Sequence, residues 1–270
     1  MAGLIAYVSN RRDRLSNVLH QEQRIVSTLA AEPAAAWGIG FYQDGEVLHK
    51  KRPMTSDHGI DWDEVASNVR SDCAVIHLRK PTVGDFRAEN IHPFRMRRWL
   101  FAHDGTIHGF DAIRDRVLHS LPDFLRRNIR GNTDSEAFFH VILSFLHSSG
   151  QLDRLDIDEH DLLESLRSSI ARIDGLTDEI GAERSALNFA LTQGASMVLV
   201  RRGPAMAYTT RVGLDETQSQ ESTPKTSDPQ AVRYVLALSL ADAPPADFQL
   251  IPEDSALLID RNLQSKVVAL

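Results

Sequence analysis

Residues Ile76 to Ile107 have the sequence IHLRKPTVGDFRAENIHPFRMRRWLFAHDGTI, in which two apolar runs enclose a polar segment. The first run belongs to DCAVIHLR, residues Asp72 to Arg79, and the second is WLFAHDG, residues Trp99 to Gly105. Short apolar runs bounded by polar residues are typical of buried β-strands. We therefore predict a buried strand at each end of the stretch and expect an Asp104-Gly105 turn to end the second one.

The chain before this stretch predicts a strand, a helix and a hairpin. Residues Leu4 to Val8 form a short apolar run, and apolar residues then recur at helical spacing from Leu15 to Leu29. The segments AWGIGFY, Ala36 to Tyr42, and EVLHKKR, Glu46 to Arg52, flank Asp44-Gly45. Because Asp-Gly supplies the positive φ angles of a tight turn, these segments predict a β-hairpin.

The chain after this stretch predicts helices followed by strands. Three helical patterns cover Phe110 to Leu118, Ser135 to Leu146 and Leu162 to Ile173, with Thr133 or Asp134 placed to cap the second. Strand patterns follow in ALNFALT, SMVLVRR and AMAYTTR from Ala186 onward, and then in Val232 to Leu240, Ala256 to Asp260 and Lys266 to Leu270. A polar segment, Glu216 to Gln230, is expected to be an exposed loop. This order predicts one α+β domain, residues 1–270, with mainly antiparallel sheets.

Composition narrows the classes of function. The chain is 42% apolar and 25% charged, which is typical of a globular domain. Its net charge of -7 argues against a nucleic-acid or membrane partner. Cys73 is the single cysteine, so an intramolecular disulfide and an all-cysteine zinc site are excluded. With no apolar run long enough for a signal peptide or a membrane span, we expect a cytoplasmic protein.

Five motifs carry a resemblance to a known family. They are His77-x-Arg79, Thr82-x-Gly84, Asn90-x-His92-Pro93, His103-Asp104-Gly105 and Asn132-Thr133-Asp134-Ser135-Glu136. In this order and spacing they resemble the signature of class-II (N-terminal-nucleophile, Ntn) glutamine amidotransferases, and Trp37-Gly38-Ile39-Gly40 is similar to a hairpin of that family. The stand-alone, single-domain branch is the most similar. The resemblance implies a four-layer αββα Ntn-hydrolase sandwich with two mainly antiparallel sheets.

The resemblance also shows which catalytic groups differ. Members of the family use a cysteine at position 2, whose thiol attacks the glutamine amide while its own α-amine serves as the base. This chain has Ala2 there. Asp104 stands where the family has an asparagine that donates to the oxyanion together with the backbone N–H of Gly105. Since loss of one such donor costs roughly 100- to 1000-fold in rate, both changes predict an inactive enzyme.

The substrate-recognition positions are present. Arg79 matches the arginine that pairs with the glutamine α-carboxylate, and Asp134 matches the carboxylate that holds the α-amino group. The resemblance also makes Thr82 and His103 ligand-binding positions. The alternative is that Arg79 and Asp134 form a structural ion pair. No cofactor is implied.

A metal site is not expected, although four histidines fall close together in the sequence. His77, His92, His103 and His108 do not follow a known ligand spacing, and three of them match family positions that do not bind metal. Gly38 and Gly40 are expected to serve backbone packing and not a phosphate loop, because no strand-to-helix transition follows them.

Two functional hypotheses remain. The first is a catalytically inactive, glutamine amidotransferase-like protein that acts by binding or regulation, through glutamine, a γ-glutamyl compound, a protein partner, or a combination of these. The second is an active glutamine amidotransferase or γ-glutamyl amidohydrolase with an unrecognised nucleophile. Cys73 and Ser9 are the candidates for that nucleophile, but neither carries a free amine beside it, and Cys73 is expected to be a buried structural residue.

Overall fold

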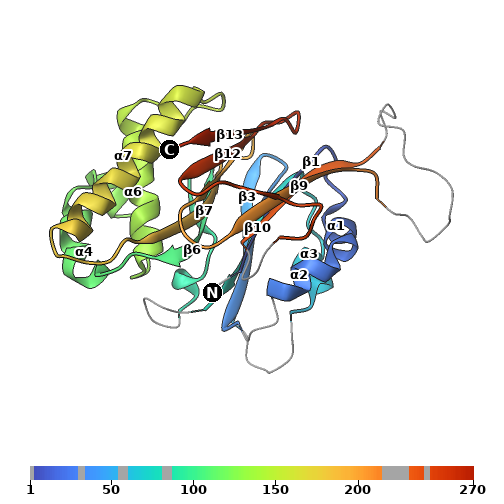
Figure 1. Ribbon diagram of the computed structural model, residues 1–270, viewed down its shortest axis with the longest axis horizontal. Helices are drawn as coiled ribbons and strands as arrows, with labels where there is room; N and C mark the ends of the chain where they lie inside the picture. The colour runs from blue at the N-terminus through green and yellow to red at the C-terminus, as the bar shows by residue number, and fades with distance from the viewer. Residues whose placement is uncertain (1–2, 30–33, 54–59, 81–86, 215–230, 240–243) are drawn as a thin grey trace.

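The molecule is built from two antiparallel sheets between two layers of helices (Figure 1). The computed structural model describes residues 3–29, 34–53, 60–80, 87–214, 231–239 and 244–270. The predicted exposed loop, Glu216 to Gln230, lies outside these residues.

The first sheet has seven strands in the order β11-β9-β10-β1-β4-β2-β3. Its strands are β1 (Gly3–Ser9), β2 (Ala36–Gln43), β3 (Glu46–Pro53), β4 (Cys73–Arg79), β9 (Met206–Val212), β10 (Arg233–Ser239) and β11 (Gln249–Leu250). The second has six strands in the order β13-β12-β8-β7-β6-β5. They are β5 (Phe94–Met96), β6 (Trp99–Thr106), β7 (Ala186–Thr192), β8 (Met197–Arg201), β12 (Ser255–Ile259) and β13 (Ser265–Ala269). Neighbouring strands pair antiparallel, as predicted.

Helices cover the outer face of each sheet. The first sheet carries α1 (Leu15–Gln21), α2 (Gln23–Leu29) and α3 (Trp62–Ala66). The second carries α4 (Phe110–His119), α5 (Asp123–Arg126), α6 (Asp134–Ser148) and α7 (Glu159–Asp178). A short 3₁₀ helix, η1 (Ala88–Asn90), precedes β5. The two helical groups lie on opposite sides of the sheets in Figure 1.

The apolar core falls into three layers because successive strand residues point to opposite faces. In β1, Ile5 and Tyr7 pack under the first helical group. Leu4 and Ala6 alternate with them and pack between the two sheets. The third layer lies between the second sheet and α4, α6 and α7. Three apolar layers between four layers of elements are the αββα sandwich that the sequence predicts.

Local turn and cap predictions are confirmed at two places. Asp44 and Gly45 have φ of 53° and 83° and join β2 to β3. The Thr133 hydroxyl oxygen accepts the backbone N–H of Glu136 at 3.1 Å, so Thr133 is the N-cap of α6. Both features arise from residue types that favour these conformations.

Two predicted features are wrong. Asp104-Gly105 is not a turn, because β6 continues through Thr106 and pairs with β7. A Cβ at position 105 would lie 2.0 Å from the Ala186 carbonyl oxygen, so the glycine permits a close approach of backbones. The helical pattern from Leu15 to Leu29 forms two helices that break at Glu22.

At the break, Glu22 makes tertiary contacts. Its carboxylate accepts from the Tyr234 hydroxyl at 2.7 Å and from Nε of Arg211 at 3.2 Å. These partners come from β10 and β9, far along the chain, so helical spacing alone does not reveal them.

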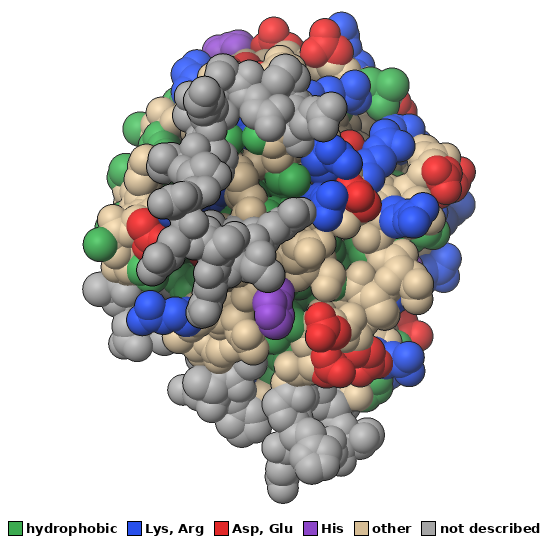
Figure 2. Space-filling model, turned by 90° about the vertical axis from the view of Figure 1, so that its right-hand side faces the viewer, with side chains coloured by type: hydrophobic (Ala, Val, Ile, Leu, Met, Phe, Trp, Pro, Cys, Tyr) green, Lys and Arg blue, Asp and Glu red, His purple; other side chains and the backbone are tan. Residues whose placement is uncertain are grey.

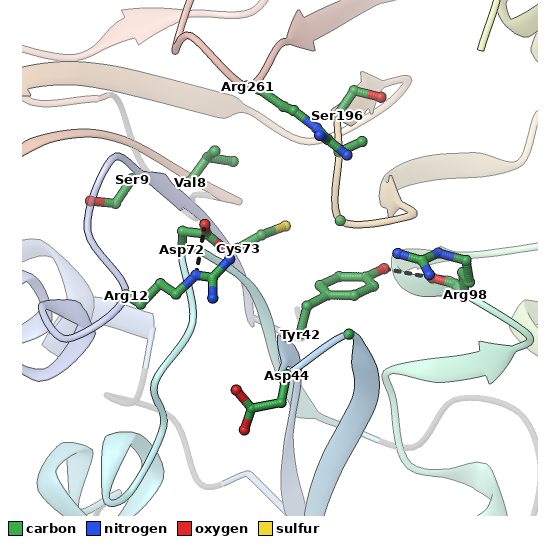
Figure 3. A pocket seen from close by; sticks show the side chains of 13 residues that line it. Val8, Ser9, Arg12, Tyr42, Asp44, Asp72, Cys73, Arg98, Ser196 and Arg261 are labelled. Atoms are coloured by element: carbon green, nitrogen blue, oxygen red, sulfur yellow. Dashed lines mark hydrogen bonds and ion pairs between the residues drawn. The ribbon is translucent and has the colours of Figure 1, made fainter. Parts of the chain in front are cut away.

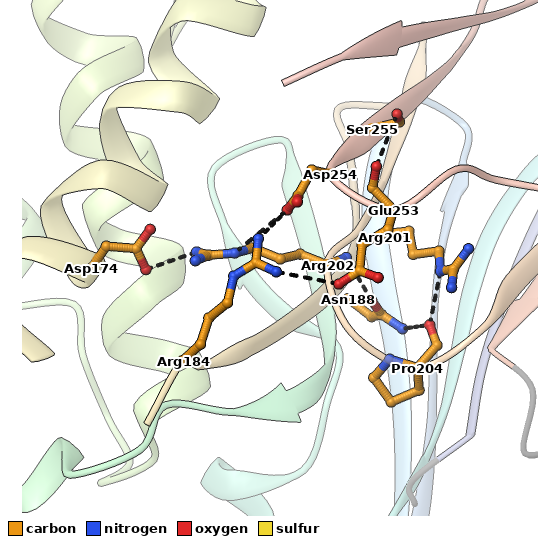
Figure 4. Close-up of polar contacts among 9 residues, drawn as sticks. All are labelled: Asp174, Arg184, Asn188, Arg201, Arg202, Pro204, Glu253, Asp254 and Ser255. Carbon is orange, nitrogen blue, oxygen red and sulfur yellow. Dashed lines mark hydrogen bonds and ion pairs between the residues drawn. The ribbon is translucent and has the colours of Figure 1, made fainter. Parts of the chain in front are cut away.

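A polar network fastens α7 to the second sheet (Figure 4). Arg202, whose side chain is 7% exposed, donates to Asp174 of α7 at 2.8 Å and lies 3.7 Å from Asp254. The backbone N–H of Arg202 donates to the side-chain oxygen of Asn188 at 2.8 Å. The guanidinium of Arg202 is thereby held between a helix and the turn before β12.

Basic side chains on the face drawn in Figure 2 gather toward its upper right, and acidic ones interrupt them. Positive charge on that face is therefore local, in a chain whose net charge is -7. Among the described helices, none combines the length and the hydrophobicity that crossing a membrane requires.

Candidate functional site

The predicted site residues gather at the end of β4. Cys73 and Val75 of this strand pack between the sheets, so His77 and Arg79 share that inner face. Arg79 is only 3% exposed, and its carbonyl accepts the backbone N–H of Ala35 just before β2. The guanidinium of Arg79 therefore belongs to the interior of the sandwich at this end.

Two imidazoles in contact, tilted 37° to each other, lie beside Arg79. The ring centroids of His77 and His92 are 4.1 Å apart, and Phe94 meets His92 edge-on at 4.5 Å. Nε2 of His77 donates to the carbonyl oxygen of His103 at 3.0 Å. Among the described residues, neither ring nitrogen of His92 has a hydrogen-bond partner, and nor does Nδ1 of His77.

Burial keeps both rings neutral. It lowers the pKa of His77 to about 3, and the charges of His103 and Arg79 act in the same direction, whereas the hydrogen bond to the His103 carbonyl opposes the shift. Burial also holds the pKa of His92 well below its ordinary value. The ring nitrogen atoms of these two buried, neutral imidazoles that have no partner can still form hydrogen bonds beside the site.

The Asn90 and Asn132 motifs form one unit, although they are distant in sequence. Nδ2 of Asn90 donates to Oδ1 of Asn132 at 2.7 Å, and the backbone N–H of Asn132 donates to Oδ1 of Asn90 at 3.0 Å. Glu136 accepts the backbone N–H groups of Arg130 and Gly131 at 2.9 and 2.6 Å. The loop before α6 is therefore fixed against η1.

His103 and Asp134 occupy positions filled by protein contacts. Nδ1 of His103 lies 2.8 Å from the Ser135 hydroxyl, and Nε2 lies 3.0 Å from the Ala186 carbonyl oxygen. Asp134 accepts the backbone N–H groups of Ile107 and Ser135, each at 2.8 Å.

Asp104 lies on the inner face of β6, as Ala102 does, and is 4% exposed. It is paired with Asn188 of β7 and is followed by Gly105, which the Ala186 backbone approaches closely. His103 alternates with Asp104 and faces α6. The structure thus separates two adjacent predicted residues onto opposite faces of one strand.

Lys51 of β3 is a site-adjacent residue that the sequence does not single out. Its Nζ lies 5.6 Å from the centroid of the Phe94 ring. Burial lowers its pKa to about 8, and the carboxylates of Glu136 and Glu89 oppose that shift. The strand EVLHKKRP carries several cations, so nothing in its pattern distinguishes the half-buried Lys51 from the others.

Three predicted positions, Ala2, Thr82 and Gly84, lie outside the described residues. Both candidate alternative nucleophiles are described, and neither is near Arg79. Cys73 begins β4 whereas Arg79 ends it, a separation of about 20 Å at about 3.3 Å per residue. Ser9 lies at the same end as Cys73 and donates to the Arg233 carbonyl oxygen at 2.9 Å.

The Cys73 thiol is unsuited to nucleophilic chemistry. It is 3% exposed and lies 3.4 Å from the Thr192 hydroxyl. Burial raises its pKa to about 12, so the thiolate is scarce at neutral pH. In the described part of the chain, no group of three or more His, Cys, Asp or Glu side chains could hold a metal ion.

Comparison with known proteins decides the family. The family model of class-II glutamine amidotransferases matches residues 1–219. The chain belongs to this family. The matched residues include all five motifs. The described members of these motifs lie together near the end of β4.

The curated relatives are distant, and each matches only in part. A probable glutamine amidotransferase of Saccharomyces cerevisiae is 28% identical over 181 residues, covering 61% of this chain and 50% of the relative. The γ-glutamyl-hercynylcysteine sulfoxide hydrolase of Mycobacterium tuberculosis is 33% identical over 78 residues, covering 27% of this chain and 32% of that protein. The match thus spans at most about half the length of these two relatives.

Solved structures share the fold. A glutamine aminotransferase class-II domain protein from Silicibacter pomeroyi matches with a TM-score of 0.63 at 20% identity, over 99% of this chain and 98% of that one. The glutamine phosphoribosylpyrophosphate amidotransferase of B. subtilis matches with a TM-score of 0.56 at 13% identity, over 99% and 49%. The two-sheet amidotransferase sandwich is therefore an Ntn-hydrolase fold.

Proposed function

We propose that this class-II glutamine amidotransferase homologue binds glutamine or a γ-glutamyl compound without hydrolysing it, and acts as a binding or regulatory protein toward a protein partner. The observation that carries the proposal is the position of the single thiol. Cys73 is buried at the opposite end of β4 from Arg79, and its pKa is raised to about 12. The site at Arg79 therefore has no thiol nucleophile from Cys73.

The residues around the site support binding. Arg79 offers a planar guanidinium to an α-carboxylate, which such a group pairs with through two parallel hydrogen bonds. The Asp134 carboxylate accepts two backbone N–H groups and the Ser135 hydroxyl, which orient it, and its two oxygens have about four acceptor positions, so one remains for an ammonium group. Asp104 is buried on the inner face of β6. When Asp104 is ionised, its charge disfavours the negative charge that develops on the substrate oxygen during amide hydrolysis.

Calorimetric titration with glutamine, glutamate and γ-glutamyl dipeptides tests the binding. We expect one equivalent of a γ-glutamyl ligand to bind, and Arg79→Ala to weaken it at least tenfold, because the carboxylate loses its charge-assisted partner. Arg172→Gln on the exposed face of α7 is the matched control and should bind normally. Absence of binding by the unaltered protein would contradict the ligand-binding proposal.

Ammonia release from glutamine tests the lack of hydrolysis. We expect none from the unaltered protein, and measurable release from the Ala2→Cys, Asp104→Asn double variant, which restores the thiol and the amide donor. Release by the unaltered protein that a single substitution abolishes would establish the alternative, an active amidohydrolase with another nucleophile.

A further inference from the structure

A cavity of about 250 Å³ opens at the other end of the sandwich from Arg79. The beginning of β4, the end of β1 and the β2–β3 turn line one side of it. Turns of the second sheet line the other side. We call it the far-end cavity, and Tyr42, Asp72, Arg12, Arg98 and Arg261 are the lining residues on which the inference depends.

Three guanidinium groups surround the far-end cavity. Figure 3 shows Arg12, Arg98 and Arg261 approaching the space above Tyr42 from three sides, whereas the Asp44 carboxylate points away from them. Arg12 is paired with Asp72 at 3.4 Å. Arg98 and Arg261 have no ion pair with a carboxylate among the described residues. Positive charge thus gathers here in a protein of net charge -7.

The floor of the far-end cavity is rigid. The Tyr42 hydroxyl lies 2.8 Å from the carbonyl oxygen of Arg98 and 2.9 Å from that of Thr192. A Cβ at Gly194 would lie 2.8 Å from the Tyr42 ring, so the ring packs directly on this turn. Tyr42 therefore ties the backbone that carries Arg98 to the β7–β8 turn. Such preorganisation reduces the entropy lost on binding.

We infer that the far-end cavity binds a small molecule through a phosphate group. Guanidinium groups match phosphate oxygens in pairs, and three of them around one space favour an anion of more than one charge. The cavity holds the volume of about eight waters at about 30 Å³ each, which suits a phosphate on a small organic group. The inference uses no residue of the Arg79 site and is independent of the function proposed there.

Calorimetry with inorganic phosphate and with ribose 5-phosphate as probes tests the inference. We expect each to bind with a stoichiometry of one and to compete with the other. The Arg98→Gln, Arg261→Gln double variant should weaken both at least tenfold and leave the melting temperature within a few degrees, because both side chains are exposed. Tighter binding of ribose 5-phosphate would assign a phosphate ester, and equal affinity would assign free phosphate.

Two variants and one competitor keep the test specific. Arg172→Gln on α7 should bind the probes normally, and so should Arg79→Ala, which changes only the other end of the sandwich. The inference fails if neither probe binds saturably, if the double variant binds both probes as the unaltered protein does, or if citrate binds as tightly as the phosphate probes.

Discussion

Gly38 lies where β2 passes the backbone of His92, and a Cβ there would lie 2.0 Å from the His92 carbonyl oxygen. Gly175 in α7 has no atom within 4 Å of the same virtual position. We expect Gly38→Ala to lower the free energy of unfolding by about 2 kcal/mol or more, since backbone must move. Gly175→Ala should raise it by about 0.5–1 kcal/mol, since alanine favours a helix.

Urea denaturation of both variants measures this difference. The m-value should stay unchanged, which would show that the midpoints report stability. Equal changes in the free energy of unfolding for the two variants would show that the nearby His92 backbone does not restrict which side chain fits at position 38.

Single residues also show where sequence patterns stop being informative. Asp44-Gly45 and Asp104-Gly105 are the same dipeptide, yet the first is a tight turn and the second lies inside β6. The first has positive φ at both residues, a local property that the sequence can predict. The second depends on the Ala186 backbone, which arrives from β7. The local sequence pattern does not predict a contact with a residue so far along the chain.

Helix α7 is joined to the second sheet by a partly buried ion pair and to α4 by an exposed one. Arg202 and Asp174 are 2.8 Å apart, with side chains 7% and 32% exposed. Arg116 and Glu179 are 2.7 Å apart, with side chains 48% and 59% exposed. We expect a coupling free energy of about 1–3 kcal/mol for the first pair and about 0–1 kcal/mol for the second, because water screens the exposed charges.

Double-mutant cycles with Arg202→Gln and Asp174→Asn, and with Arg116→Gln and Glu179→Gln, measure these couplings by urea denaturation. Similar couplings in the two cycles would contradict a special role for the Arg202 network in holding α7.

Most elements were predictable, because their apolar periodicity reflects the layers they join. The longer strands of both sheets and the three long helices follow from alternation and helical spacing. The short elements α3, α5, β5 and β11 were not predicted, because two to five residues carry too little periodicity. The break between α1 and α2 was missed because Glu22 is held by Tyr234 of β10.

The stability of the whole molecule should depend on pH through its buried histidines. His77 has a folded-state pKa near 3, below its ordinary value of 6.5, and the pKa of His92 is also lowered. Between pH 6.5 and about 3 the unfolded chain binds the His77 proton and the folded protein does not, and His92 acts in the same direction below pH 6.5. Each histidine therefore lowers the free energy of unfolding by up to about 1.4 kcal/mol per pH unit as pH falls.

Urea denaturation at several pH values between 7 and about 4 measures this dependence. His77→Gln removes one titrating group, so we expect its stability to fall less steeply than that of the unaltered protein over this window. An unchanged slope in the variant would show that His77 does not remain neutral in the folded state.

The motifs predicted which residues lie together at one end of the sandwich, and only part of their geometry. The five motifs identify Arg79, Asp104 and Asp134, and the structure brings their described members to one end of the sandwich. It also shows that His103 faces α6 and that Lys51 approaches Phe94. These facts depend on side-chain direction and on neighbours across the sheets, which motif spacing does not specify. The far-end cavity is formed by turns from both sheets and has no sequence signature.

Strand β3 is an edge strand of the seven-stranded sheet. Its sequence affects whether copies of the molecule associate through this edge at high concentration. An uncovered outer strand offers unpaired backbone groups to any other extended chain. In β3, Lys50, Lys51 and Arg52 stand in succession before Pro53, and Lys50 is turned aside to the Ser67 carbonyl oxygen at 2.6 Å. Like charges on two such strands repel each other, and proline removes a donor. The strand whose Lys51 lies beside Phe94 therefore also disfavours edge-to-edge aggregation of the sheet.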